Sequence, residues 1–500
     1  MPAGRVAAGI LVTRLLGFVR ERVFAHYFGN TPAAGAFRAA LRIPNAIRNL
    51  LGEGTLSASF IPVYAGMIAR GETENARRLS GVIVSLLTLV TAIAALLGMV
   101  LAPVITDLVA PGFAGETRAL TVTLVQIMFP MAGVLILSAW CLGVLNTHRR
   151  FFLSYAAPSA WNIAQIAALV GAGGVLAGAR LAVALAVGAV VGSALQLLVQ
   201  LPSTLRLAGS IRWGIQFDAP GVRTVVRAWL PVIVGAGVLQ ISSIVETQLA
   251  SFLGADAVAV LGYAQLLALL PVALFGVSVA AAALPELSRD AAVADAGVLQ
   301  RRLTDGARRV AFFVIPSAFG LTALGGPIVA TLFETGQFGP DDTALVAGVL
   351  AAYAIGLPAQ ASVKLFASGF YAIGDTRTPV RYAVVSVVLG AGLAALFMQR
   401  FGPAGIALGA ALAAYVNVGL LTVSLGRRIG PLMGPTERRA LLVTAVGALA
   451  GTASGVGVAR ALAAVPVWAT TVTAVAGFGL VYMAVTMALR HPDAMGLLRR

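Results

Sequence analysis

The sequence is poor in charged residues and rich in apolar ones. Of its 500 residues, 11% are charged and 59% are hydrophobic, and the mean hydropathy is +0.93. Globular chains average about 45–50% apolar and about 25% charged residues, so this composition excludes a water-soluble or disordered protein. Its 56 glycines and 23 prolines follow no Gly-X-Y period, which excludes a collagen-like chain. The composition predicts an integral membrane protein.

Cysteine and histidine are scarce. Cys141 is the only cysteine, so no intrachain disulfide or thiolate metal cage can form. The histidines, His26, His148 and His491, are too far apart in sequence to predict a metal site. The chain also lacks a G-x-x-x-x-G-K-[ST] loop and an H-E-x-x-H motif. We therefore expect a protein that is not an enzyme, with no catalytic residues, cofactor or metal.

Apolar stretches long enough to cross a bilayer recur along the chain. A crossing helix needs about 20 mostly apolar residues. That window gives fourteen segments, centred near residues 16, 50, 91, 133, 163, 190, 238, 271, 319, 355, 390, 413, 449 and 478. Charges interrupt the first segment, which predicts a retained span rather than a cleaved signal peptide. Residues 33–69 are too long for one straight crossing. Two crossings there would give fifteen spans and place the N-terminus outside the cell. Arg5 argues against that arrangement, because arginines near span ends stay in the cytoplasm.

Arginines are distributed unevenly between alternate loops. One set of loops and ends holds 24 arginines, and the other holds Arg118, Arg180, Arg400 and Arg460. Lys and Arg near span ends stay on the cytoplasmic side of a membrane. The pattern predicts that both termini are cytoplasmic. It also explains the net charge of +16 without nucleic-acid binding.

A faint internal repeat relates the two halves of the chain. Five pairs recur at offsets between 221 and 227 residues: Gly29 and Gly254, Pro44 and Pro271, Pro62 and Pro285, Gly143 and Gly369, Pro158 and Pro379. Six spans fit that interval, so the sequence predicts two pseudo-symmetric six-helix lobes related by an axis along the membrane normal, a layout used by secondary transporters. We expect lobes at 1–205 and 206–430, with two further helices and a cytoplasmic tail at 431–500.

Seven cations fall inside the predicted spans, six of them in the first two segments. They are Arg14, Arg20, Arg22, Arg38, Arg42, Arg48 and Lys364. A cation at the bilayer centre costs ~2.5–3.5 kcal/mol on insertion scales, so such a group marks a water-filled cavity or a substrate path. At helical spacing, one face about 140° wide carries Arg38, Arg42, Asn45, Arg48 and Glu53. Arg14 and Glu21 share a face of the first segment.

The charges within the spans are net positive, which predicts an anionic cargo. Of the 35 cations, 34 are arginine, whose planar donors match phosphate oxygens. Arg22 and Lys364 have an alternative role, in which their side chains extend to the lipid headgroups. Glu246 lies mid-span and either couples a proton or cation to transport or hydrogen-bonds Gln240 or Gln248.

Several motifs carry a likeness to a known family. They are T-R-L-L-G-F-V-R-E (13–21), R-I-P-N-A-I-R-N-L-L-G-E-G-T-L-S-A-S-F-I-P-V-Y (42–64), V-A-P-G-F (109–113), G-V-L-N-T-H-R-R-F (143–151), L-F-E-T-G-Q-F (332–338) and V-K-L-F-A-S-G-F-Y-A-I-G-D-T-R-T-P-V (363–380). Together they resemble the MurJ/MviN family of lipid II flippases, within the multidrug/oligosaccharidyl-lipid/polysaccharide exporter superfamily. The first two are specific, and the later ones are weak individually.

The resemblance implies fourteen transmembrane helices, one bent helix over 33–69, and alternating access that carries a peptidoglycan precursor outward. The family's cavity arginines match Arg14, Arg20 and Arg48, its acid matches Glu21, and further basic positions match Arg42 and Lys364. We add Arg38 and Asn45 as substrate-binding candidates and Glu246 as a coupling candidate. The implied partners are lipid II and membrane lipids, and the implied location is the bacterial inner membrane. We expect a monomer.

Two departures from the family keep other functions open. Gly35 stands where the family usually has an acid, and Gln265, Leu266 and Leu269 replace an aspartate, an arginine and a further acid. Either Arg38 compensates or the cargo differs from lipid II. The alternatives are a flippase for another polyprenyl-phosphate oligosaccharide, a cation-coupled drug exporter and a noncatalytic scaffold. A drug exporter needs membrane acids, which are few here.

Overall fold

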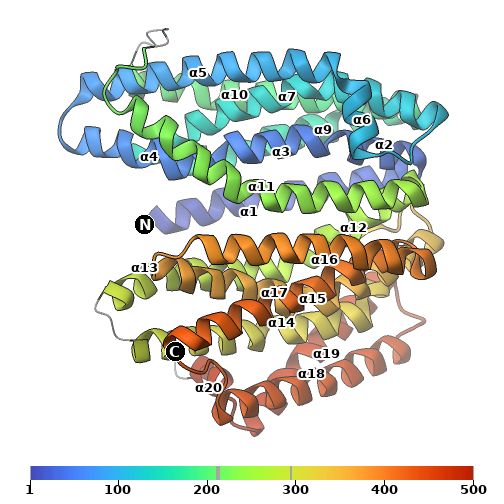
Figure 1. Ribbon diagram of the computed structural model, residues 1–500. Coiled ribbons are helices and arrows are strands. Elements are labelled where there is room, and N and C mark those ends of the chain that lie inside the picture. The colour runs from blue at the N-terminus through green and yellow to red at the C-terminus, as the bar shows by residue number, and fades with distance from the viewer. Residues whose placement is uncertain (1, 210–213, 215, 293–295, 499–500) are drawn as a thin grey trace. The chain divides into compact units, whose positions relative to one another are not determined.

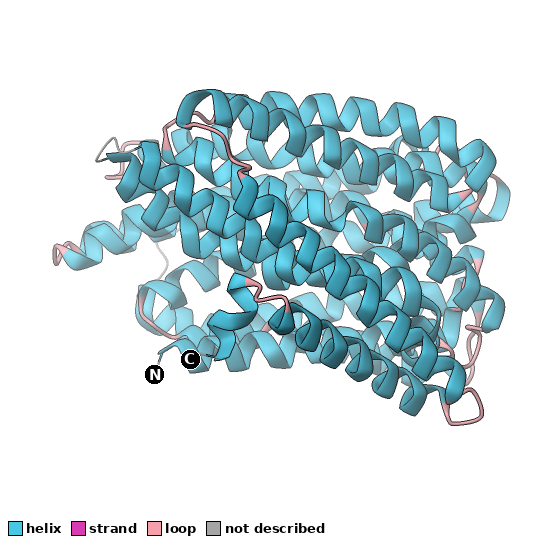
Figure 2. Ribbon diagram, turned by 90° about the horizontal axis from the view of Figure 1, so that it is seen from below, coloured by secondary structure: helices cyan, strands magenta, loops and turns pink. Residues whose placement is uncertain are grey.

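The protein is built almost entirely of helices in a computed structural model, which describes residues 2–209, 214, 216–292 and 296–498 (Figures 1 and 2). The first helices are α1 (Pro2–Phe28), α2 (Pro32–Ala40), α3 (Arg42–Leu51), α4 (Glu53–Ala69), α5 (Thr73–Val100), α6 (Ala102–Val109), α7 (Gly115–Thr147), α8 (Phe151–Ala156), α9 (Pro158–Gly173), α10 (Gly178–Ala208) and α11 (Val222–Leu253). The later ones are α12 (Ala255–Pro271), a π-helical turn (Val272–Val277), α13 (Ser278–Ala292), α14 (Ala296–Phe333), α15 (Pro340–Ala372), α16 (Arg377–Phe401), α17 (Pro403–Ile429), α18 (Pro435–Ala461), α19 (Val467–Ala488) and α20 (Pro492–Leu498). An isolated bridge between Thr335 and Phe338 is the only strand pairing in the described part.

The chain divides into two compact units. The first comprises Met1–Ala259 with Thr335–Phe338, and the second comprises Val260–Glu334 with Gly339–Arg500. In the first unit α7 packs against α5 and α10, α1 against α8 and α9, and α11 against α3 and α4. In the second unit α15 packs against α14 and α17, and α18 against α19. The lobe boundaries at 205 and 430 stay a prediction, because these units are defined by packing and not by the repeat.

Among the described residues, ten stretches are long and apolar enough to cross a membrane. They are α5, α7, α10, Ala255–Ala281, Gly297–Phe333 in α14, and α15, α16, α17, α18 and α19. The protein is therefore an all-helical, multi-pass membrane protein. Every one of the fourteen predicted centres falls in a helix, but those near 16, 50, 163 and 238 fall on α1, α3, α9 and α11, which are not among the ten. The number fourteen stays a prediction.

The long second segment is three helical pieces rather than the one bent helix that the family resemblance implied. α2 ends before Leu41 and α3 ends before Gly52, whose φ of −93° and ψ of −130° leave the helical region. Pro44 lacks the N–H that would continue the hydrogen-bond ladder. A Cβ at Gly52 would lie 2.4 Å from the Arg48 carbonyl oxygen, so the second break requires glycine.

Two pairs of repeat glycines have the same local role in both halves. Gly29 and Gly254 each end a long helix with a positive φ, of 54° and 124°. Gly143 and Gly369 each allow close packing, since an added Cβ would lie 3.3 Å from Phe60 or 3.0 Å from a Leu303 methyl. The two glycines of each pair thus have similar surroundings, and the repeat itself stays a prediction.

Each unit has an aromatic core. In the first unit Trp140, Phe60 and Tyr64 are fully buried, and the last two rings stack with centroids 5.1 Å apart. In the second unit the Tyr482 hydroxyl donates to the Phe312 carbonyl oxygen at 2.5 Å. Lipid tails are as apolar as leucine, so close packing and internal hydrogen bonds hold such helices together.

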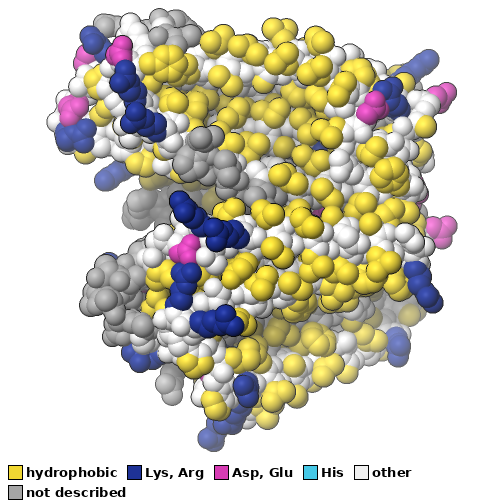
Figure 3. Space-filling view, in the orientation of Figure 1, with side chains coloured by type: hydrophobic (Ala, Val, Ile, Leu, Met, Phe, Trp, Pro, Cys, Tyr) yellow, Lys and Arg dark blue, Asp and Glu magenta, His cyan; other side chains and the backbone are white. Residues whose placement is uncertain are grey.

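Apolar side chains cover the visible flanks of each unit, and most of the visible charges lie toward helix ends (Figure 3). α16 is the most exposed of these spans, because only 6% of its apolar window is buried, against 56% for α15. The arginines counted in the topology analysis include Arg212, Arg499 and Arg500, which lie outside the described residues, as do the side chains of Arg5 and Glu53.

Asp375, in the turn before α16, provides a test of this local structure. Its carboxylate accepts hydrogen bonds from the N–H groups of Arg377 and Thr378, both at 3.0 Å, and from the Thr378 hydroxyl at 2.6 Å. An ion pair with Arg428 at 2.8 Å adds to them. The Thr378 bonds and this ion pair lower the pKa of Asp375 from 3.8 to about 2. Stability from this carboxylate is therefore present above about pH 3.8 and is lost as the pH falls toward 2.

We expect Asp375→Ala to lower the free energy of unfolding by about 1 kcal/mol at neutral pH, as for the loss of a helix cap. Its melting temperature in detergent should also fall less than that of the wild type between pH 4 and pH 2. Asp375→Asn keeps the acceptor for the backbone N–H groups and loses the ion pair, so its stability should be intermediate. If the melting temperature of Asp375→Ala fell as much as that of the wild type between pH 4 and pH 2, this carboxylate would not stabilise the turn.

Candidate functional site

Glu21 is the centre of a charged cluster that joins α1 to α2 in the first unit. One carboxylate oxygen pairs with Arg20 at 2.6 Å, and the other pairs with Arg38 at 2.9 Å. The Glu21 side chain is 11% exposed, and the arginines are 20% and 16% exposed. Two cations and one anion leave the cluster with one net positive charge. The shared carboxylate therefore holds both arginines in place.

Aromatic rings and an amide complete this cluster. The Arg20 guanidinium lies 5.0 Å from the centre of the Trp161 ring and donates to the side-chain oxygen of Asn162 at 3.2 Å. The Arg38 guanidinium lies 4.9 Å from the centre of the Phe24 ring. Partly buried cation–π contacts contribute ~0.5–2 kcal/mol each. Sequence reasoning missed Trp161 and Asn162, since they lie about 140 positions after Arg20 on α9 and no local pattern marks them.

The polar residues of α3 reach a different helix. Arg42 donates to the Ser243 hydroxyl of α11 at 2.8 Å, and Asn49 donates to the Gln240 side chain at 3.4 Å. Arg48 and Asn45 are half-buried. The buried side-chain oxygen of Asn45 accepts no hydrogen bond in the described part of the structure. The predicted basic face is thus divided: Arg38 on α2 contacts α1, whereas Arg42 on α3 contacts α11.

The remaining candidates lie outside these clusters. Arg14 is exposed on α1, and Lys364 is exposed on α15 in the second unit. Glu246 on α11 is half-buried. Of its suggested partners, Gln240 accepts a hydrogen bond from Asn49, and Gln248 donates one to the Leu108 carbonyl oxygen at 2.6 Å. Among the described residues, no group of three or more His, Cys, Asp or Glu side chains is placed to hold a metal.

Gly35, where the family usually has an acid, has no room for a side chain. A Cβ there would lie 1.8 Å from the Ala255 carbonyl oxygen, so α2 and the start of α12 meet backbone to backbone. This contact gives a packing reason for the glycine. On α12, Leu269 is exposed and Leu266 is half-buried, so neither position supplies a charge.

Comparison with known proteins identifies the family of this chain. A family model described as lipid II flippase MurJ matches residues 24–486. The chain belongs to the MurJ family. A probable lipid II flippase MurJ from Rhizobium meliloti (strain 1021) is 35% identical over 436 residues, covering 84% of this chain and 79% of that protein. The lipid II flippase MurJ of Burkholderia cenocepacia is 34% identical, covering 85% and 83%.

Solved structures agree with this assignment to the MurJ family. A lipid II flippase MurJ in an inward closed conformation aligns with a TM-score of 0.80 and 25% identity, covering 97% of this chain and 98% of that one. An inward-facing multidrug resistance MATE family transporter of the MOP superfamily aligns with a TM-score of 0.69 at 17% identity, covering 86% and 98%. The second match shows a shared fold.

Replacing Glu21 tests whether its carboxylate holds the two arginines. Glu21→Gln leaves two poorly solvated guanidinium groups without their anion, and we expect the free energy of unfolding to fall by about 3 kcal/mol. The measurement is thermal or denaturant unfolding of the purified protein in detergent. Glu74→Gln is the matched control, because Glu74 is half exposed and pairs with Arg78 at 3.6 Å on a helix surface, where a pair contributes little. Equal effects of the two substitutions would contradict the proposed role of Glu21.

Proposed function

We propose that this protein translocates lipid II, the polyprenyl-pyrophosphate-linked peptidoglycan precursor, from the cytoplasmic to the outer leaflet of the bacterial inner membrane. Membership of the MurJ family supports the cargo. The observation that carries the proposal is the Arg20–Glu21–Arg38 cluster, because its net positive charge on apolar helices suits an anionic headgroup. Alternating access is the proposed mechanism, with both termini in the cytoplasm and the protein acting as a monomer.

In this proposal Arg20 binds the pyrophosphate directly. A guanidinium has five N–H groups, and Arg20 donates to Glu21 and Asn162 within the described structure. Donors therefore remain for phosphate oxygens, and the planar group can bind two of them at once. Glu21 and Trp161 fix its orientation before the substrate arrives. Less of the binding free energy is then spent on ordering the side chain.

Arg14, Arg42 and Arg48 would extend the positive surface along the headgroup in a water-filled central cavity. A pyrophosphate cannot cross a low-dielectric medium unpaired, since an isolated buried anion costs tens of kcal/mol by Born solvation. Several partly hydrated arginines reduce that cost without trapping the anion as a dry ion pair would. The side-chain oxygen of Asn45 adds an acceptor for a sugar or peptide N–H or O–H. Lys364 on α15 would supply a further cation.

The membrane potential is the proposed energy source. With the cell interior negative, each negative charge moved outward gains ~2.3 kcal/mol per 100 mV. The negative charge of a pyrophosphate thus lets the membrane potential drive export without nucleotide. After release of the cargo, the same potential draws the positively charged empty cavity back toward the cytoplasmic side. Glu246 is the candidate if a proton or cation is also coupled.

A second cargo deserves a direct comparison because of one observation. Where the family resemblance implies an arginine in the eighth helix, α12 of this chain has Leu266. Another polyprenyl-phosphate-linked oligosaccharide would need fewer cationic contacts than lipid II. Complementation of a bacterium depleted of its own lipid II flippase separates the two, because a flippase for another cargo would not restore growth.

Substituting Arg20 and Arg48 tests the binding step. We expect Arg20→Ala and Arg48→Ala each to lower the rate of headgroup transfer in vesicles roughly 10–100-fold, since a hydrogen bond to a charged group contributes ~1.5–3 kcal/mol. The assay measures access of an impermeant reagent to the lipid II headgroup in vesicles containing the purified protein. Arg180→Gln, on the exposed first turn of α10, is the control and should transfer at the wild-type rate. Mild effects of both alanine substitutions would favour a noncatalytic scaffold.

Removing the membrane potential tests whether it is the energy source for transfer. In vesicles with an imposed potential that is negative on the side where lipid II starts, transfer should be faster than at zero potential. It should slow when an ionophore removes the potential. The control is empty vesicles with the same potential. Transfer that is insensitive to the ionophore would exclude this coupling.

A further inference from the structure

A second basic site lies in the first unit, separate from the arginine cluster of α1 and α2. It is a pocket of about 680 Å³ between the turn that joins α7 to α8 and the end of α10. The residues that line it are His148, Arg149, Arg150, Phe151, Phe152, Leu153, Ser203, Arg206 and Leu207. Three of these are arginines and none is an acid. The volume is in the range of small-molecule sites.

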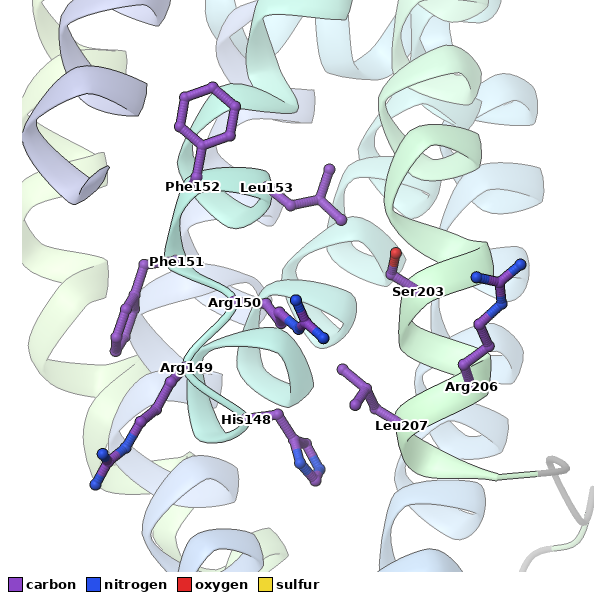
Figure 4. A pocket seen from close by; sticks show the side chains of 9 residues that line it. All are labelled: His148, Arg149, Arg150, Phe151, Phe152, Leu153, Ser203, Arg206 and Leu207. Carbon is purple, nitrogen blue, oxygen red and sulfur yellow. The ribbon is translucent and has the colours of Figure 1, made fainter. Parts of the chain in front are cut away.

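The arrangement of the side chains is that of an anion site with an apolar wall. In Figure 4 the Arg150 guanidinium lies between the α7–α8 turn and α10, with Leu153, Ser203 and Leu207 around it. Arg149 and Arg206 lie on either side of Arg150, on the α7–α8 turn and on α10 (Figure 4). His148 is held by a contact of 3.3 Å with the Tyr64 hydroxyl. No described carboxylate pairs with these three arginines to neutralise them.

Arg149 has a backbone conformation that favours glycine. Its φ is 59°, in the left-handed region, and it closes α7 by donating its N–H to the Asn146 carbonyl oxygen. The same turn recurs 225 residues later, the offset that also separates Gly29 from Gly254. There Gly374 has a φ of 78° and donates to Tyr371. The first half of the chain thus has an arginine where the second half has the less strained glycine, so the left-handed turn itself does not require the arginine side chain.

The pocket lies where an exposed apolar surface of α10 ends. Val187, Val191, Leu195 and Leu198 are exposed along this helix and form an apolar stripe, and Arg206 follows in its last turn. Phe152 is also exposed, at 51%. Exposed apolar side chains beside arginines place the pocket at the depth of phospholipid headgroups.

We propose that this pocket binds the phosphate of an anionic phospholipid from the surrounding leaflet, with Arg150 as the direct contact and Arg149 and Arg206 at its rim. The phosphate accepts hydrogen bonds from the guanidinium and from the Ser203 hydroxyl, and the acyl chains lie along the α10 stripe. Basic pockets between transmembrane helices bind such headgroups in this way. The site is distinct from the transport cluster and does not depend on the proposed function.

Thermal unfolding in detergent tests the proposal, with phosphatidylglycerol, phosphatidylcholine or inorganic phosphate added as separate probes. For the wild type, phosphatidylglycerol should raise the melting temperature more than the other two. Arg150→Gln should remove most of this difference, and the apparent affinity should weaken about fivefold for each arginine lost. Arg149→Gly should also reduce the shift, although its melting temperature without lipid should equal or exceed that of the wild type, because the turn becomes less strained.

Arg490→Gly is the matched control. Arg490 has a φ of 55° and closes α19 with the same pattern of backbone bonds, outside the pocket. It should keep the full shift produced by phosphatidylglycerol. A shift of equal size with inorganic phosphate would show a site for free anions, and would overturn the lipid assignment. Equal shifts with both lipids, or an undiminished shift in Arg150→Gln, would overturn the site itself.

Discussion

The site depends on one interaction, in which the Glu21 carboxylate bridges the guanidinium groups of Arg20 and Arg38. One carboxylate pairs with both cations on these apolar helices, and the contact joins α1 to α2. Desolvating these charges is costly, so the pairing is better understood as a means of positioning the arginines than as a source of stability. The surplus positive charge is the property that suits an anionic cargo.

The breaks in the second segment determine how these charges are shared. Because α2 ends before Leu41, Arg38 and Arg42 lie on separate helices and contact α1 and α11 respectively. A straight helix would have kept both on one face. The backbone contact between Gly35 and Ala255 fixes α2 at the start of α12 and leaves no room for an acid there. The structure thus gives a packing reason for one of the two departures from the family.

Much of the fold could be predicted from composition and the length of apolar runs, because a backbone in lipid must satisfy its own hydrogen bonds and therefore forms helices. The segments centred on α5, α7, α10 and α14 to α19 were recognisable in this way. The three-part second segment was not, since a proline or glycine can bend a helix or end it and the surroundings decide which. The charged candidates were visible because they interrupt apolar runs. Trp161 and Asn162 were not visible, since their role comes from packing between α1 and α9.

The central claim is that the arginines of α1 to α3 recognise phosphate charge on a lipid carrier. The direct measurement is the equilibrium affinity of the purified protein for polyprenyl carriers that bear the same headgroup through a diphosphate, a monophosphate or a neutral linkage. The account predicts that affinity falls in that order and that added salt weakens the diphosphate most. Equal affinity for the three carriers would contradict it.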